Sequence, residues 1–171
     1  MRYKKAMGAD EVNLALRQAT PQDEPFLRRM LWIAAHWRDP VSPPPQGALS
    51  DEHARYTEGF GRPGDHGVVA TCAGAAVGAA WCRVLTAPHG GYGYVADDIP
   101  ELSVAVLPDY RGRGIGGQLL ERVLSDISGD FDAVSLSVEP ANPARLLYER
   151  LDFVLVGIRA GSWTMVRSLS G

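Results

Sequence analysis

Residues 104–117 read VAVLPDYRGRGIGG, and this stretch decides how the chain folds. The apolar residues before Pro108 predict a strand, and the four glycines between Gly112 and Gly117 predict a turn that leads into a helix. Because glycine has no Cβ and tolerates positive φ, backbone N–H groups in such a turn can converge on one anion at the start of a helix. The stretch therefore predicts a phosphate-binding loop.

The glycines are followed by an amphipathic pattern that predicts a helix. Its apolar face comprises Leu119, Leu120, Val123, Leu124 and Ile127, and its polar face comprises Gln118, Glu121, Arg122 and Asp126.

Several known phosphate-binding loops bind different ligands, and their sequence patterns distinguish them. The chain contains no G-x-x-x-x-G-K-[ST] sequence, which excludes a P-loop. Gly112, Gly114 and Gly117 satisfy the dinucleotide-binding pattern G-x-G-x-x-G, and Glu139 ends the next strand, where a ribose-binding acid could lie. However, the first glycine does not follow its strand directly, and too few residues remain for a second mononucleotide-binding half. A nucleotide-binding oxidoreductase stays open as an alternative.

Two segments resemble the GNAT acyltransferase superfamily. Arg111-Gly112-Arg113-Gly114-Ile115-Gly116 matches the cofactor loop Q/R-x-x-G-x-G/A at every specified position. Residues 142–153, NPARLLYERLDF, are similar to N-x-x-A-x-x-L-Y-x-x-x-G-F, displaced by one residue before the alanine. Asp152 replaces the usual glycine of this family, and Asp can adopt the left-handed conformation at modest cost. The resemblance covers residues 101–153, about a third of the chain.

The periodicity predicts an α/β chain with strands of mixed direction, and the resemblance implies the same fold, a GNAT-type mixed central sheet in the order β-α-α-β-β-β-α-β-α-β-β. The expected elements are a strand over 12–17, a helix from Thr20 to about Trp37 that ends before a proline-rich loop, a short helix over 49–60, a hairpin over 68–85, and strands over 133–138, 154–158 and 163–166. We expect residues 1–10 to form a flexible leader and residues 11–171 to form a single domain.

The resemblance further implies an N-acetyltransferase that moves an acetyl group from acetyl-CoA directly to a primary amine. In this family the strand before the loop and the strand after the helix diverge, which leaves a gap for the thioester. The implied cofactor-binding residues are Val104, Val106, Arg111, Gly112, Arg113, Gly114, Ile115, Gly116, Gly117 and Asn142. Asn142 could cap a helix, bind the pantetheine arm, or do both. A catalytically silent CoA-binding sensor is a second alternative.

Direct acyl transfer needs a base for the amine, a donor for the oxyanion and an acid for the leaving thiolate. Glu101, at the start of the strand before the loop, is the candidate base, with Asp97 and Asp98 as alternatives. Tyr148 matches the tyrosine of the family motif and is the candidate acid, although its helix face would also suit a core aromatic. A backbone N–H near Val106 would bind the oxyanion.

The acceptor is the least determined part of this hypothesis. Trp32, Tyr56, Tyr92 and Asp98 are the candidate substrate-binding residues, because aromatic rings and carboxylates favour a cationic amine. The aromatic residues could equally belong to the core. The sequence does not choose between a small amine, an amino acid, a protein N-terminus and a lysine. The acyl chain and the oligomeric state, a homodimer included, also stay open.

Composition narrows the possible partners and location. The chain has 171 residues, a net charge of −3 and 46% hydrophobic residues, so it can bury a core but has no overall attraction to nucleic acid or anionic membranes. No segment reads as a membrane span or signal peptide, which predicts a cytoplasmic protein. Cys72 and Cys82 have no metal-ligand spacing, so we expect buried reduced thiols and no metal site.

Overall fold

A computed structural model describes residues 13–40 and 49–170. Its strands are β1 (Leu14–Gln18), β2 (His66–Cys72), β3 (Ala75–Arg83), β4 (Glu101–Val106), β5 (Ala133–Val138), β6 (Val154–Arg159) and β7 (Ser162–Ser168). Its α-helices are α1 (Glu24–Ala35), α2 (Asp51–Ala54), α3 (Ile115–Ile127) and α4 (Ala144–Arg150), and short 3₁₀ helices cover Pro21–Asp23 and Pro108–Tyr110. The predicted α/β fold with a mixed sheet is confirmed.

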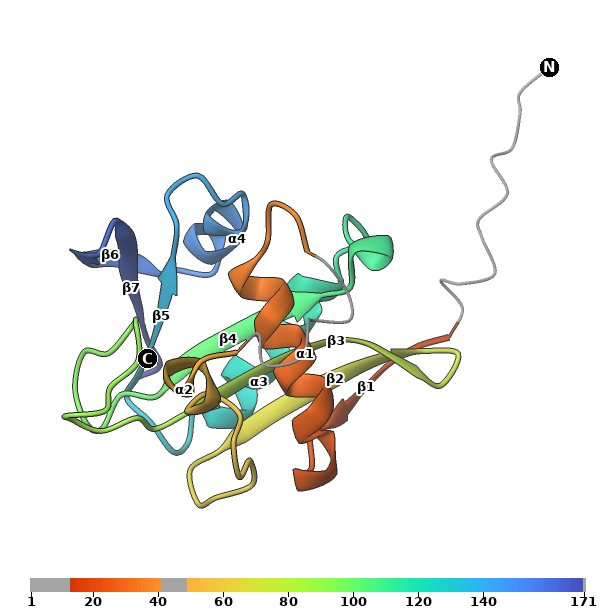
Figure 1. The fold of residues 1–171 in the computed structure, drawn as a ribbon, viewed down its shortest axis with the longest axis horizontal. Helices are drawn as coiled ribbons and strands as arrows, with labels where there is room; N and C mark the ends of the chain where they lie inside the picture. Colours follow the sequence, from red (N-terminus) through yellow and green to blue (C-terminus); the bar gives the residue numbers. More distant parts are fainter. Residues whose placement is uncertain (1–12, 41–48, 171) are drawn as a thin grey trace.

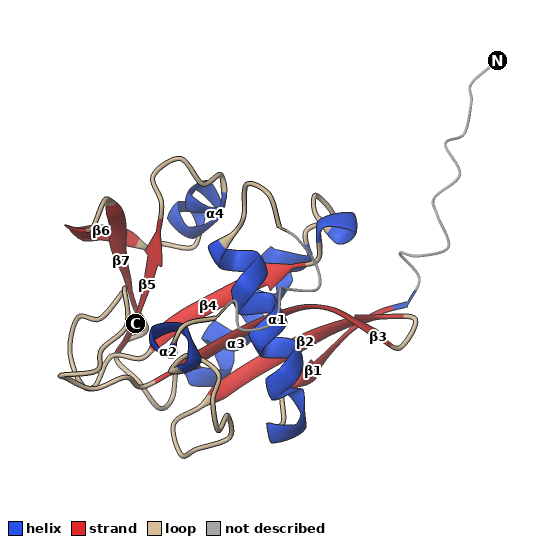
Figure 2. Ribbon diagram, in the orientation of Figure 1, coloured by secondary structure: helices blue, strands red, loops and turns tan. Residues whose placement is uncertain are grey.

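The strands form one seven-stranded sheet in the order β1-β2-β3-β4-β5-β7-β6. Within the described residues, the β4–β5 pair is the single parallel pair, and the other neighbours are antiparallel. Helices cover both faces: Figure 1 shows α1 in front of the sheet and α3 behind it, and Figure 2 separates the helices from the strands by colour. This sheet lacks the mostly parallel strands of a doubly wound dinucleotide-binding fold.

The two faces of the sheet carry separate apolar clusters. The predicted apolar face of α3 is confirmed, because Leu119, Leu120, Val123, Leu124 and Ile127 are all buried against the sheet. On the opposite face, α1 buries Leu27, Met30, Leu31 and Ile33 against β3 and β4. Along β4, Leu102 belongs to the α3 side and Ala105 to the α1 side, so Glu101 and Ser103 also face the α1 side.

The strands β4 and β5 diverge almost as soon as they meet. Their pairing is confined to Glu101 opposite Ser135, where the Ser135 N–H donates to the carbonyl of Pro100 at 3.0 Å. From there to the ends of both strands, no ladder joins them in the part of the chain that the structure describes. The divergence implied by the resemblance is therefore present.

Several predicted boundaries are corrected. The helix expected from Thr20 to Trp37 starts as a 3₁₀ turn and ends at Ala35, which leaves Trp37 in the following turn. The helix expected over 49–60 is reduced to Asp51–Ala54. The predicted leader and the prolines Pro43, Pro44 and Pro45 lie outside the described residues.

Candidate active site

The free edge of β4 is the first part of the site. The Leu107 N–H donates to the carbonyl of Val77 at 2.8 Å, so odd-numbered residues bond to β3 in the antiparallel register. The backbone N–H and C=O groups of the even-numbered residues Val104 and Val106 must then face β5. The carbonyl of Pro100, also an even-numbered residue, does face β5, because it accepts from Ser135. Because β5 has already diverged, the N–H groups of Val104 and Val106 have no strand partner there.

The start of α3 lies just beyond this edge and offers free donors. Gly112 and Gly114 have φ of +73° and +78°, and a Cβ built on either would meet no other atom within 4 Å. The first bond into the helix is the Gln118 N–H to the Gly114 carbonyl, at 3.2 Å. The N–H groups of Ile115, Gly116 and Gly117 therefore have no acceptor among the described residues, and they point towards the open start of the helix.

The two arginines of the loop lie beside these donors. The Arg111 guanidinium donates to the carbonyls of Val106 at 3.2 Å and Trp37 at 3.4 Å, which ties the loop to β4 and to the end of α1. Arg113 donates to the Asp109 carbonyl at 3.1 Å and lies over the Tyr110 ring, with 5.2 Å to the ring centroid. Both side chains are exposed and close to the loop, as an anion site requires.

Helix α4 brings the second motif next to the first. A Cβ on Gly116 would lie 3.8 Å from Leu147 and 3.9 Å from Val106, so α4 flanks the start of α3 and the end of β4. The Asn142 side chain accepts from the Ala144 N–H at 2.9 Å, which is a helix cap, and its amide N–H groups bond to no described residue.

Tyr148 is 8% exposed and packs edge-on against Phe153, with ring centroids 5.9 Å apart. Its hydroxyl forms no hydrogen bond with any residue in the described ranges 13–40 and 49–170. Burial raises the pKa of Tyr148 above its ordinary value. The phenol therefore stays protonated at neutral pH and keeps a proton to donate. Asp152 closes this helix with φ of +62°, as predicted.

Glu101 lies in a buried network and is 3% exposed. Its carboxylate accepts from the N–H groups of Gly91 and Gly93, both at 2.7 Å, and from the Tyr56 hydroxyl at 3.2 Å. Burial raises the pKa of Glu101, and these donors partly oppose the rise. These hydrogen bonds hold the loop that contains Gly91 and Gly93. The same loop lies directly against the sheet, because a Cβ on Gly93 would lie 2.7 Å from the Leu136 backbone.

The four candidate acceptor residues occupy different settings. Tyr92 is 42% exposed and stacks on the buried Tyr56 ring at 6.5 Å between centroids, while its N–H donates to the Tyr56 hydroxyl at 2.6 Å. Trp32 stacks on His36 at 3.6 Å. Asp98 is exposed and forms no hydrogen bond or ion pair with the described residues. Asp97, the other alternative base, instead accepts from the Ala87 N–H and the Tyr94 hydroxyl, both at 2.8 Å.

A bridge across the diverging strands was not predicted. Arg38 donates to Glu139 at 2.7 Å and lies over the Trp37 ring at 4.3 Å. Since Arg111 also binds the Trp37 carbonyl, the turn after α1 joins the end of β4 to the end of β5. The Trp37 indole N–H is shielded from solvent and has no partner among the described atoms. Arg38 was not singled out from the sequence, and Glu139 was named only as a possible ribose-binding acid, because the two residues are 101 positions apart.

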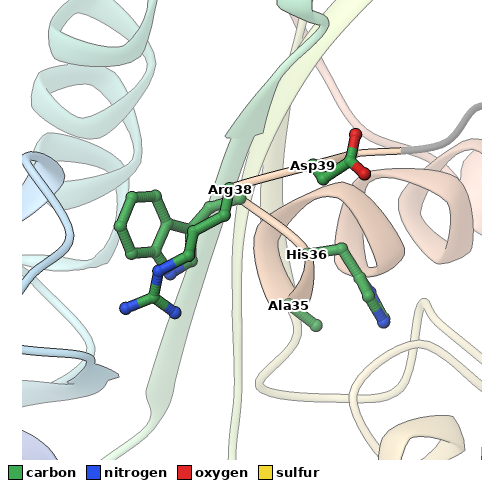
Figure 3. Close-up of a pocket in the computed structure, with 5 residues that line it drawn as sticks. Ala35, His36, Arg38 and Asp39 are labelled. Atoms are coloured by element: carbon green, nitrogen blue, oxygen red, sulfur yellow. The ribbon is translucent and has the colours of Figure 1, made fainter.

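Two shallow hollows flank this bridge. One is lined by residues 35–39, and Figure 3 shows His36 and Arg38 pointing to different sides of the turn there. The other, about 370 Å³, is lined by Arg38, Glu139, Pro140, Ala141, Ala160, Gly161 and Ser162. The second hollow opens between β5 and the β6–β7 turn, on the α1 side of the sheet.

The sequence model of the acetyltransferase (GNAT) domain family matches residues 63–155, which is more than half of the 171 residues. The chain belongs to the GNAT family. This GNAT chain is also 40% identical over 63 residues to an N-alpha-acetyltransferase of Saccharolobus solfataricus, a match that spans 35% of this chain and 38% of that relative.

Solved structures share the GNAT fold over almost the whole chain. The acetyl-CoA complex of yncA from Salmonella typhimurium superposes with a TM-score of 0.68 at 20% identity, covering 93% of this chain and 95% of that one. A phosphinothricin acetyltransferase from Sinorhizobium meliloti in complex with acetyl-CoA gives 0.60 at 23% identity, covering 91% and 88%. A ribosomal-protein-alanine N-acetyltransferase from Brucella melitensis gives 0.64 at 22%, covering 90% and 99%.

No described helix of this GNAT chain has the length and apolar character needed to span a bilayer. Cys72 and Cys82 are free and buried, as predicted, and burial raises the pKa of Cys82 to about 12.

Proposed function

We propose that this protein is an N-acetyltransferase that transfers the acetyl group of acetyl-CoA directly to a primary amine. The observation that carries the proposal is the meeting of two sets of free backbone donors. The start of α3, whose first N–H groups are free, lies close to the free edge of β4, because a Cβ on Gly116 would lie 3.9 Å from the Val106 side chain. An anion at the first set and a thioester at the second would match the two ends of acetyl-CoA.

The described residues fit that substrate. The loop glycines leave space where side chains would project, and the Trp37 indole N–H lacks an acceptor near the strand ends. Arg111 and Arg113 would add positive charge near the phosphates, and the free amide of Asn142 would serve the pantetheine arm. The Val106 N–H would hold the oxyanion in place, and Tyr148 would protonate the leaving thiolate.

The acceptor would enter from the α1 side of the sheet, where the hollow at Glu139 opens. Tyr56, Tyr92 and Trp32 lie on elements of that side, and Glu101 supports the loop that carries Tyr92. Glu101 as the base stays a prediction, as do a role of Asp98 in acceptor binding, a cytoplasmic location and a homodimer.

The experiment is an assay of thiol release from acetyl-CoA with a panel of small primary amines, free amino acids and short peptides. We expect at least one acceptor to give amine-dependent release, with the acetylated amine identified by mass spectrometry. Binding of acetyl-CoA without release for any acceptor would contradict transfer and would favour the silent CoA-binding sensor.

A further inference from the structure

We infer that Glu139, rather than Glu101, takes the proton from the acceptor amine. The inference rests on the proposed acetyl transfer. Glu139 is the residue directly after β5, and its carboxylate is one end of the ion pair with Arg38. The two GNAT-like motifs give Glu139 no role, because the loop motif ends before it and the second motif begins after it, at Asn142.

Glu139 follows β5, the strand that borders the gap opposite β4. Glu101 pairs with Ser135, and the strands diverge from there; Glu139 lies four residues beyond Ser135, as Ala105, the neighbour of Val106, lies four residues beyond Glu101. Glu101 lies four residues earlier on β4, which is roughly 13 Å at the rise of an extended strand. Glu139 therefore lies towards the same end of the gap as Val106, whereas Glu101 lies where the gap begins.

The side chain of Glu139 also faces the side from which an acceptor would come. Val134, Leu136 and Val138 are buried on the α3 side of β5, so Glu139 points to the other side, where Arg38 meets it. It lines the hollow of about 370 Å³ and its side chain is 41% exposed. Glu101 is 3% exposed and lines neither of the two hollows.

The hydrogen-bond partners of the two carboxylates also favour Glu139 over Glu101. Glu101 already accepts from two backbone N–H groups and one hydroxyl. One oxygen of Glu139 accepts from Arg38, and its other oxygen has no partner among the described residues. That free oxygen can accept an ammonium proton, while Arg38 holds the carboxylate towards the hollow.

The proton balance is complete with these groups. The ammonium form of the acceptor gives one proton to Glu139, and the neutral amine forms a C–N bond to the thioester carbonyl as the C–S bond breaks. The second nitrogen proton replaces the one that Tyr148 gives to the thiolate. The products are the amide, CoA thiol and protonated Glu139, which returns its proton to solvent.

Glu139→Gln tests this assignment, with Glu149→Gln as the matched control. Glu149 also pairs with an arginine, Arg145, and its side chain is likewise 41% exposed. With the best acceptor from the panel, we expect Glu139→Gln to lower kcat/KM about 100-fold at pH 7 and to recover as pH rises towards the amine pKa. Calorimetric affinity for acetyl-CoA and the melting temperature should match wild type. The control should match wild type in all three readouts.

Glu101→Gln tests the competing assignment, in which Glu101 is the base. Its amide N–H would face the N–H groups of Gly91 or Gly93, so we expect a lower melting temperature and a raised acceptor KM with an unchanged pH profile. An amine that is neutral at pH 7, such as methoxyamine, should lose less rate in Glu139→Gln than an alkylamine does.

An active wild type with an unchanged pH profile in Glu139→Gln would overturn the assignment, and a shifted profile in Glu101→Gln would return the base role to Glu101. A wild type that binds acetyl-CoA but transfers to no amine would overturn the proposed function and this inference with it.

Discussion

Tyr148 combines burial with an unpaired hydroxyl. The hydroxyl bonds to none of the described residues and is not among the side-chain polar atoms shielded from solvent, while the ring packs in the α3-side cluster and edge-on against Phe153. The helix that carries it flanks the start of α3 through Leu147. In the proposed function this hydroxyl would lie beside acetyl-CoA and donate a proton to the leaving thiolate.

Tyr148→Phe keeps the ring packing and removes the donor. We expect kcat to fall about 100-fold, with the Kd for acetyl-CoA within a factor of two of wild type, because the lost interaction acts mainly in the transition state. Steady-state kinetics and calorimetry check this. Full activity in the variant would leave Tyr148 as a core residue only.

Gly114 is the loop position where we expect a side chain to weaken acetyl-CoA binding most. Gly114→Asp would place a carboxylate in the open space before α3, where the proposed site would hold the phosphates, so we expect acetyl-CoA to stop raising the melting temperature. Gly74→Asp is the matched control, because Gly74 has φ of +83° and equally open surroundings at the β2–β3 turn. Both variants should lose about 1 kcal/mol of stability from the left-handed backbone. Equal responses to acetyl-CoA would show that the loop is not the binding site.

Residues inside contiguous motifs could be predicted from the sequence, and residues joined by long-range contacts could not. The glycines of the loop and Tyr148 each lie in a contiguous motif, and the residue pattern of that motif indicates the proposed role. The Arg38–Glu139 bridge joins positions 101 residues apart, and nothing local to either residue indicates it. Glu101 was predicted as a site residue, but its burial depends on the loop that folds over it.

At the scale of elements, the start of α1 is stabilised by a charge pair as well as a cap. Asp23 accepts from the Thr20 N–H at 2.8 Å and pairs with Arg17 at 2.7 Å. The bond from Arg17 is the main cause that lowers the pKa of Asp23 below its ordinary value of 3.8, and burial opposes it. The ionised carboxylate therefore stabilises the folded state.

This lowered pKa has a defined pH dependence. A group with a depressed folded pKa contributes stability above its unfolded pKa and loses it as pH falls through the folded value. We expect Asp23→Asn to cost about 1 kcal/mol at pH 7, and the gap from wild type to shrink below pH 4. Urea denaturation at pH 7, 5 and 3 measures it. A constant gap across this range would contradict the role of the charge.

The types of these elements followed from periodicity, but their ends did not. The capping pattern at Thr20 correctly marks the start of the first helical segment. The helix ends at Ala35, and the turn that follows is held by Arg111 of the loop before α3, through the Trp37 carbonyl, and by Glu139, which follows β5, through Arg38. Such tertiary contacts override the local preference that predicted a longer helix.

At the scale of the whole molecule, one parallel pair in the otherwise antiparallel described sheet opens the gap at which the proposed site lies. The pair meets only at Glu101 and Ser135 and then opens, so backbone donors on β4 face the gap while α3 and α4 close one side. The turn after α1 crosses the strand ends from the other side. This arrangement suits a long thioester that passes between two faces and meets its acceptor on the α1 side.

Thermal unfolding of the wild-type protein with acetyl-CoA, CoA, NADH and NADPH tests the central claim most directly. At a concentration of about 100 Kd, a ligand that binds only the folded state adds about 2.7 kcal/mol, which is a rise of roughly 5–10 °C for a chain of this size. We predict that rise for acetyl-CoA and CoA and no change for either dinucleotide. A rise with NADH or NADPH and none with acetyl-CoA would contradict the account.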